Sequence, residues 1–450
     1  DGALTVLGAG PAALVGQGLG GLVALDLALR SPARCPLLVL DGLPVLSAQD
    51  RQRWADTYGT PIAPELDGSH LLRQWYRRRA ELLRDPLDLT PPHTVAERLH
   101  RAVLDRLQAG DDSARPHRAA AGYDAADALQ RVAVPTVHLR CGPEPVDRHA
   151  ATAQALEPWR GTPAVPRHPA PARARGRWTV DFPGTPRGQV AARRFRPEGD
   201  PVARPLVVLH AAPLSGEAML AFAQPFTAGR EVVLLDTLGN GDSDRPDEPL
   251  TAADFARVAL DAIAALGIER FDLYGTHTGA VLALEAALAA PERVAALVLN
   301  GVPLYTPQEA AQVWDGYFLD LTPRWDGTHL VAAWSNATDV LTWYPWHRRD
   351  PAHRRTLPAL DAPSLHRRFV QMAKGGVSYC AAHRAVADHP TRERLAALCV
   401  TTAFCRLAAD PLAGGLAECL SLVPAAAVLD VTGVPEQDAR SITNWTATIG

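Results

Sequence analysis

A histidine at the centre of a glycine-flanked turn is the residue of this chain best placed to do chemistry. His277 lies in the run Gly275-Thr-His-Thr-Gly279, between apolar residues 271–274, which predict a buried strand, and an Ala/Leu-rich run that predicts a helix. The two glycines let neighbouring backbone approach closely and allow a strained conformation at the middle residue. A side chain on such a turn projects into a pocket. An imidazole there could act as a base or as a transient acyl acceptor.

Other polar residues follow segments that also predict buried strands. His210 comes after residues 206–209, and Asp236 comes after residues 231–235. Both are candidates for the wall of the same pocket, while Asp410, farther along the chain, is the candidate carboxylate that would fix the tautomer of His277. A set of His277, His210 and Asp236 could in principle bind a metal, but its spacing is not diagnostic. We expect no metal ion and no cofactor.

Strand-like and helix-like segments alternate over residues 178–450. Residues 178–196 alternate in polarity and turn at Pro183-Gly184, which predicts an opening hairpin. Further strands are expected at residues 206–209, 231–235, 271–274, 296–300, 399–406 and 428–431. Thr251 is a plausible N-cap for a helix over residues 251–266, and residues 305 to about 395 predict a helical insert. This alternation favours an α/β fold with a mostly parallel sheet covered by helices on both faces.

The chain also contains an internal repeat. Displaced by 259 residues, residues 15–32 match residues 274–291, and the register continues without a gap to Trp75, which falls on Trp334. An ungapped match of this length indicates a duplication rather than a coincidence.

The first copy is expected to be partial and inactive. Residues 1–157 would begin at about the glycine turn, with Gly18 at the position of His277 and Glu144 alone at the position of the acid. Residues 158–177 are rich in Arg, Pro and Ala and predict a linker, which leaves residues 178–450 as the nearly complete copy. Strands that should precede the first turn are missing. We expect either that the protein continues upstream or that another surface, such as a second copy, covers the exposed sheet edge by self-association.

The second copy resembles the α/β-hydrolase superfamily. The runs His210-x-x-Pro213, Asp236-x-x-Gly-x-Gly-x-Ser243 and Gly-x-His-x-Gly fall in the family order. The resemblance is closer still to members with Gly-x-His-Thr-Gly in place of Gly-x-Ser-x-Gly. It implies an α/β-hydrolase fold, with a mostly parallel sheet, helices on both faces and a helical cap at residues 305–395.

The resemblance also implies roles for single residues. Asp410 would be the catalytic acid, and the backbone N–H groups of Ala211 and Thr278 would form the oxyanion hole. The family pattern is broken at two places, because His277 stands at the nucleophile position and no histidine follows His389 to serve as the usual base. His277 could therefore be a catalytic imidazole, a ligand-binding residue in a pocket without acyl chemistry, or a polar filler in an inactive site.

The helical insert supplies three candidate substrate-binding residues. His329 follows Asp326-Gly-Thr, where a helix-capping turn explains it as well as a pocket role does. Trp343 and Trp346 belong to an aromatic cluster that could be a packed hinge or an apolar substrate wall. Either arrangement suits a small, partly apolar ligand between cap and sheet.

Composition excludes several other functions. The net charge of −4 shows no signature of nucleic-acid binding, and no stretch of 18 uncharged apolar residues is present. We expect no signal peptide. The six cysteines lack CxxC spacing, which favours free thiols in a reducing cytoplasm. We expect neither nucleic acid nor membrane as a partner, only a small molecule.

Two functions remain open from the sequence. The first is an atypical hydrolase acting on a small carbonyl or ester-type substrate through the second copy. The second is a non-catalytic pseudo-hydrolase that binds a ligand or acts as a scaffold. Turnover that is lost in a folded His277→Ala variant separates the two.

Overall fold

The computed structural model describes residues 10–83, 92–139, 175–355 and 360–449. The chain forms two compact units, residues 1–64 with 69–173 and residues 65–68 with 174–450. Most of the predicted linker at residues 158–177 lies outside the described residues, as does Glu144. None of the described helices is long and apolar enough to cross a bilayer.

The second unit is built on an eight-stranded sheet with the order β13-β12-β11-β10-β8-β9-β7-β4. Six strands are parallel, and β7 and β4 join antiparallel at one edge. The strands, with the two-stranded β5-β6 hairpin, are β4 (Trp178–Asp181), β5 (Gly184–Thr185), β6 (Gly188–Gln189), β7 (Ala192–Phe195), β8 (Leu206–Leu209), β9 (Val232–Leu235), β10 (Phe271–Thr276), β11 (Val294–Asn300), β12 (Thr402–Arg406) and β13 (Ala427–Asp430).

Successive side chains along these strands point to opposite faces of the sheet and pack into two apolar cores, one on each face. In β8, Val207 packs with α10 (Ala252–Ala265) and α11 (Thr278–Ala289), while Val208 packs with α9 (Leu220–Ala223) and α18 (Pro435–Thr446). Both faces are covered, so the central strands are buried throughout and read as continuous apolar runs. Thr251 caps α10 with a capping box, as the sequence predicts.

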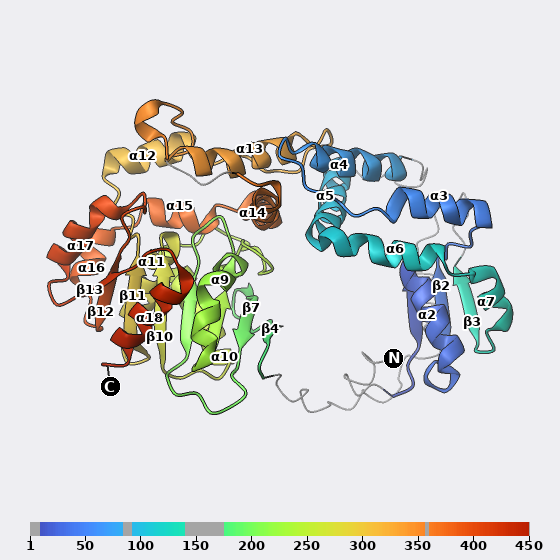
Figure 1. The fold of residues 1–450 in the computed structure, drawn as a ribbon, viewed down its shortest axis with the longest axis horizontal. Helices are drawn as coiled ribbons and strands as arrows, with labels where there is room; N and C mark the ends of the chain where they lie inside the picture. The colour runs from blue at the N-terminus through green and yellow to red at the C-terminus, as the bar shows by residue number, and fades with distance from the viewer. Residues whose placement is uncertain (1–9, 84–91, 140–174, 356–359, 450) are drawn as a thin grey trace. The chain divides into compact units, whose positions relative to one another are not determined.

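A helical region connects β11 to β12 and lies along one end of the sheet (Figure 1). Its helices are α12 (Pro307–Gly316), α13 (Thr328–Thr342), α14 (Ala362–Gly375), α15 (Ala381–Ala387) and α16 (Thr391–Ala396). After β12, α17 (Leu416–Leu422) leads into β13. The helical insert expected at residues 305–395 is therefore helical in the structure.

The first unit contains a three-stranded parallel sheet with the order β1-β2-β3. Its elements are β1 (Leu14–Gln17), α2 (Leu19–Arg30), β2 (Leu38–Asp41), α3 (Ala48–Tyr58), α4 (Ser69–Leu82), α5 (Pro92–Ala109), α6 (Ala114–Ala121), α7 (Ala125–Arg131) and β3 (Thr136–Leu139). Within the described residues, β1 pairs with β2 alone, whereas β10 of the second unit pairs with both β11 and β8.

The two units share local geometry at a constant offset in the sequence. The bounds of α2, moved by 259 residues, coincide with those of α11, and the β1-β2 register coincides with the β10-β11 register. Gly18 has φ 52° and ψ −120°, and His277 has φ 50° and ψ −114°. The N–H of each donates to the last residue of the next strand, Gly18 to Asp41 O at 3.0 Å and His277 to Asn300 O at 2.9 Å.

The start of α11 lies against the end of β8, and this contact predicts unequal effects of one substitution in the two units. A Cβ on Gly279 would lie 2.3 Å from the Leu209 carbonyl oxygen, whereas a Cβ on Gly20, the equivalent residue of α2, would meet nothing within 4 Å. Gly279→Ala should therefore destabilise the protein by about 1–3 kcal/mol or more. Gly20→Ala should be neutral or stabilise it by up to about 1 kcal/mol. Thermal unfolding followed by circular dichroism measures both, and equal effects would contradict the packing described.

Candidate active site

His277 occupies a strained backbone position between β10 and α11. It is the one non-glycine residue with positive φ in the described part of the chain. Such a conformation costs about 1–3 kcal/mol and persists only where the surroundings enforce it. The surroundings here are two backbone hydrogen bonds, from His277 N–H to Asn300 O and from Ala280 N–H to His277 O, both 2.9 Å. Backbone strain at a residue whose side chain is partly exposed is a common mark of a functional site.

The imidazole of His277 is paired with Asp410, which follows β12. His277 Nε2 lies 2.8 Å from Asp410 Oδ2, and the side chains are 32% and 7% exposed. Burial alone would raise the pKa of Asp410, but the hydrogen bond and charge of His277 and the Leu412 N–H outweigh it, so the pKa is lowered. An ionised carboxylate can only accept, so His277 donates its Nε2–H. This leaves the lone pair on Nδ1, which has no partner in the described part of the chain.

Gly301 lies directly beside the pair. A Cβ there would be 2.4 Å from His277 Cδ2 and 2.9 Å from Asp410 Oδ2, and Gly301 has φ 60°. Only glycine allows both this backbone angle and this close approach. The end of β11 therefore fixes how near the imidazole and the carboxylate can lie to the sheet.

The two backbone groups expected to form an oxyanion hole lie at adjoining element ends. Thr278 is the first residue of α11, so its N–H has no acceptor within the helix. Ala211 follows His210 at the end of β8, and a Cβ on Gly279 would be 2.6 Å from the His210 carbonyl oxygen. The helix N-terminus thus lies against the residue that precedes Ala211, and the helix dipole favours negative charge at this point.

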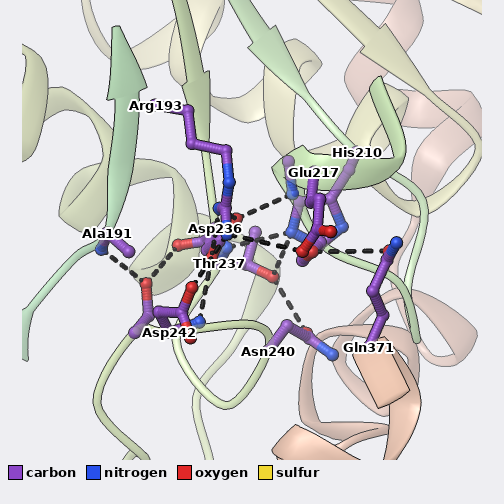
Figure 2. Close-up of polar contacts among 12 residues, drawn as sticks. Ala191, Arg193, His210, Glu217, Asp236, Thr237, Asn240, Asp242 and Gln371 are labelled. Carbon is purple, nitrogen blue, oxygen red and sulfur yellow. Dashed lines mark hydrogen bonds and ion pairs between the residues drawn. The ribbon is translucent and has the colours of Figure 1, made fainter. Parts of the chain in front are cut away.

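His210 and Asp236 point into a separate buried network. His210 Nε2 accepts the Thr237 N–H at 3.1 Å, and burial lowers the pKa of its ring, which is therefore neutral. Asp236 accepts from Arg193 Nη1 through both carboxylate oxygens, each at 2.9 Å, in the network drawn in Figure 2. Asp236 also accepts the N–H groups of Gly216 and Asp242. Because their polar atoms are already bonded to other groups, His210 and Asp236 stabilise the loops after β8 and β9. We propose no catalytic role for either residue.

Residues 204–333 match the family model described as the alpha/beta hydrolase fold. The second unit has the α/β-hydrolase fold. The chain is 42% identical over 73 residues to 2-hydroxymuconate semialdehyde hydrolase of Pseudomonas putida, covering 16% of this chain and 26% of that protein. It is 32% identical over 146 residues to a proline iminopeptidase of Xylella fastidiosa, covering 28% of this chain and 44% of that protein. The chain thus spans less than half the length of these curated relatives.

A solved hydrolase from Pseudomonas aeruginosa is also similar. Its TM-score is 0.42 at 20% sequence identity, and the match covers 60% of this chain and 96% of that structure.

The cap residues expected to bind substrate in the α/β-hydrolase unit are engaged in structural contacts. His329 is 1% exposed, and its Nδ1 accepts the Arg324 N–H at 3.1 Å just before α13. Trp346 donates its Nε1–H to the Tyr317 carbonyl at 3.0 Å, and Trp343 forms a backbone bridge with Arg354. No described group of three or more His, Cys, Asp or Glu side chains could hold a metal ion.

Two cavities lie beside the loop that carries Asp410. One of about 270 Å³ is lined by Asp410 and Gly301, and it shares Val302, Leu412 and Gly415 with a second of about 480 Å³. The larger cavity has an aromatic wall of Tyr305, Tyr317 and Tyr344. Tyr344 belongs to the aromatic cluster predicted from the sequence around Trp343 and Trp346. Tyr305 and Tyr317 lie in no recognisable sequence motif.

A second histidine, not identified from the sequence, lies near His277. His383 of α15 is 7% exposed, its Nε2 lies 3.3 Å from the Tyr305 hydroxyl, and its ring contacts that of Tyr317. Burial, and to a lesser degree the charge of His277, lower the pKa of His383 to about 4. His383 is therefore neutral at pH 7, and its buried Nδ1 has no hydrogen-bond partner among the residues that the structure describes.

The lowered pKa of His383 predicts a specific pH dependence of stability. Its pKa falls from 6.5 in a model compound to about 4 in the fold, so the unfolded chain binds the proton more readily. The stabilisation is complete above about pH 6.5 and is lost as the pH falls towards 4. Urea unfolding between pH 7 and pH 4 should show a steeper loss of stability for the natural protein than for His383→Phe. Parallel curves would contradict a buried, neutral His383.

Proposed function

We propose that the second unit is an atypical α/β-fold hydrolase acting on a small carbonyl or ester-type substrate. The observation that supports this best is the 2.8 Å contact between His277 Nε2 and Asp410 Oδ2 at a strained elbow. His277 is the central catalytic group, Asp410 orients it, and the N–H groups of Ala211 and Thr278 stabilise the oxyanion.

The chemistry follows from the free lone pair on His277 Nδ1. Nδ1 takes a proton from water, and the resulting hydroxide attacks the carbonyl carbon of the ester. Negative charge develops on the carbonyl oxygen and is stabilised by the two backbone N–H groups. The imidazolium, stabilised by Asp410, then returns the proton to the leaving alkoxide as the carbon–oxygen bond breaks. The products are a carboxylic acid and an alcohol, and the imidazole is regenerated.

Direct attack by Nδ1 is the other route open to the same residue. It would form an acyl-imidazole and release the alcohol first, after which water would hydrolyse the acyl group. The two routes differ in kinetics, because only an accumulating acyl-enzyme gives a burst of alcohol.

The alternative function is a non-catalytic pseudo-hydrolase that binds a small ligand or serves as a scaffold. Two departures from the usual catalytic set favour it. The central residue of the elbow, His277, has no hydroxyl or thiol, and the residues between β13 and α18 include no histidine. In that case His277 and Asp410 recognise a ligand without turning it over.

We further propose that the first unit is a partial, inactive copy of the same fold, with Gly18 at the position of His277. The matching helix bounds, strand register and elbow angles support this proposal. A glycine at the elbow provides no side chain for catalysis, so any activity belongs to the second unit.

Activity of His277→Ala tests the proposed function. Turnover of p-nitrophenyl esters from acetate to octanoate should fall by about 10²–10⁴-fold in His277→Ala, because the general base is lost. Asp410→Asn should also lower kcat, since the tautomer is no longer fixed. His138→Ala, which removes an exposed histidine of the first unit, is the matched control and should keep full activity. Circular dichroism establishes that each variant folds.

The outcomes separate the two functions and the two routes. Full turnover in a folded His277→Ala variant would contradict the catalytic role, and an absence of turnover in the natural protein favours the binding function. A stoichiometric burst of nitrophenol indicates the acyl-imidazole route.

Self-association through the first unit is a separate proposal. Within the described residues one edge of β1 has no partner strand, and Val15 on that strand is 49% exposed. An unpaired apolar edge is a template for pairing with another chain. Val15→Lys should therefore shift a concentration-dependent oligomer to monomer in sedimentation velocity. A natural protein that is monomeric at all concentrations would contradict the proposal.

A further inference from the structure

One side of the cavity of about 480 Å³ carries an arginine between two histidines of the cap. His347, Arg348 and His353 all contribute to its lining. Arg348 donates to the amide oxygen of Gln312, and its Nη1 lies 3.4 Å from His353 Nε2, while His353 Nδ1 lies 2.8 Å from Asp350. A guanidinium has five N–H donors, so these two partners leave most of its hydrogen-bonding capacity unused.

The acidic residues of the same cavity are already bonded to other groups. Glu309 accepts from the backbone N–H and hydroxyl of Thr306 at 2.8 and 2.9 Å in the capping box of α12. Glu418 is paired with Arg392, whose Nε lies 2.6 Å from its carboxylate. In the described part of the chain, Arg348 has no carboxylate partner, so its charge remains uncompensated on the cavity wall.

A second polar atom beside Arg348 also lacks a partner. The Nδ1 atom of His347 is buried and makes no hydrogen bond within the described residues. Burial, followed by the charges of Arg348 and His353, lowers the pKa of His347, so its surroundings are positive. Buried polar atoms are nearly always bonded, so a ligand or an ordered water in the cavity is needed to supply the missing partner.

The other side of this cavity lies beside the loop that carries Asp410. Pro411 and Leu412, which follow Asp410 in the chain, line it together with Tyr305 and Tyr344. Tyr344 is close enough to Asp410 for the carboxylate to contribute to its raised pKa. A molecule that fills the cavity would therefore extend from Arg348 to the neighbourhood of Asp410 and pack against tyrosine rings.

We propose that Arg348 and His347 bind a carboxylate on the substrate, so that the substrates are small aromatic acids whose carbonyl or ester group lies at the far end, near His277. This inference rests on the proposed function for the reacting end of the molecule. One guanidinium and a neutral imidazole match a single negative charge. The nearby carboxylates of Glu309 and Glu418 disfavour a dianion such as a phosphate monoester.

Ligand binding tests the carboxylate site without relying on turnover. Isothermal titration calorimetry of the full chain would compare 3-phenylpropanoate with its neutral analogue 3-phenylpropanamide and with phenyl phosphate. The natural protein should bind the carboxylate at least about tenfold more tightly than the amide, because charge-assisted hydrogen bonds are the stronger ones. Arg348→Gln should abolish this preference, and Arg348→Lys should keep part of it, since lysine retains the charge without the planar fork.

The adjacent arginine provides the matched control. Arg349 is largely exposed and pairs with Asp339 at 2.7 Å, so Arg349→Gln should retain the preference for the carboxylate. Equal binding of carboxylate and amide by the natural protein, no detectable binding of either, or an equal loss in both arginine variants would overturn the proposal. Tighter binding of phenyl phosphate than of the carboxylate would overturn the choice of a monoanion.

The same titration in His277→Ala keeps the two proposals distinguishable. A carboxylate preference that depends on Arg348, in a natural protein that shows no ester turnover, would reject the catalytic function and leave the binding site standing. Turnover of neutral esters without a carboxylate preference would do the reverse.

Discussion

The close approach of α11 to the ends of β8 and β10 is the constraint on which the site depends. Gly279 meets the carbonyl oxygens of Leu209 and His210, and Gly275 meets Gly279 itself, at distances that admit no side chain. The chain must therefore turn from strand to helix within one residue, and that residue takes a positive φ. The cost of this backbone at His277 is offset by the packing of the whole central sheet. The side chain of His277 at this point is bonded to Asp410 but remains partly exposed, so a ligand can reach it.

The hydrogen-bond partners of its two ring nitrogens determine what the partly exposed imidazole of His277 can do. Asp410 comes from the loop after β12 and is anchored by the Leu412 N–H, so it presents a fixed acceptor to one ring nitrogen only. The other ring nitrogen, Nδ1, has no partner within the described residues and is available to a substrate or ligand. Burial lowers the pKa of the nearby His383 to about 4, so that imidazole carries no charge at pH 7.

Much of this arrangement could be predicted from the sequence because it is encoded locally. The two glycines around His277 are required by the turn, and the order of strands along the chain brings Asp410 to the same edge of the sheet.

The roles of His210 and Asp236 could not be predicted from the sequence in this way. Asp236 is bonded to Arg193, which lies 43 residues earlier on β7, and no local sequence pattern predicts that pairing. His383 and Arg348 were missed for a related reason, since the surroundings of a cap side chain depend on how helices without a sequence motif pack together. Arg348 in particular lies in a run of charged residues that resembles an ordinary solvated surface.

In the first unit, the equivalent turn has a glycine, Gly18, at the position of His277. Gly18 adopts the backbone angles of His277, and its N–H keeps the corresponding hydrogen bond to the neighbouring strand, although no side chain is present to benefit. The turn is thus a property of the strand–helix junction rather than of the side chain that occupies it. One polypeptide carries the same backbone turn twice, once with an imidazole and once without a side chain. The elbow therefore does not need the group that we propose for catalysis, and a side chain could be exchanged at this position without loss of the turn.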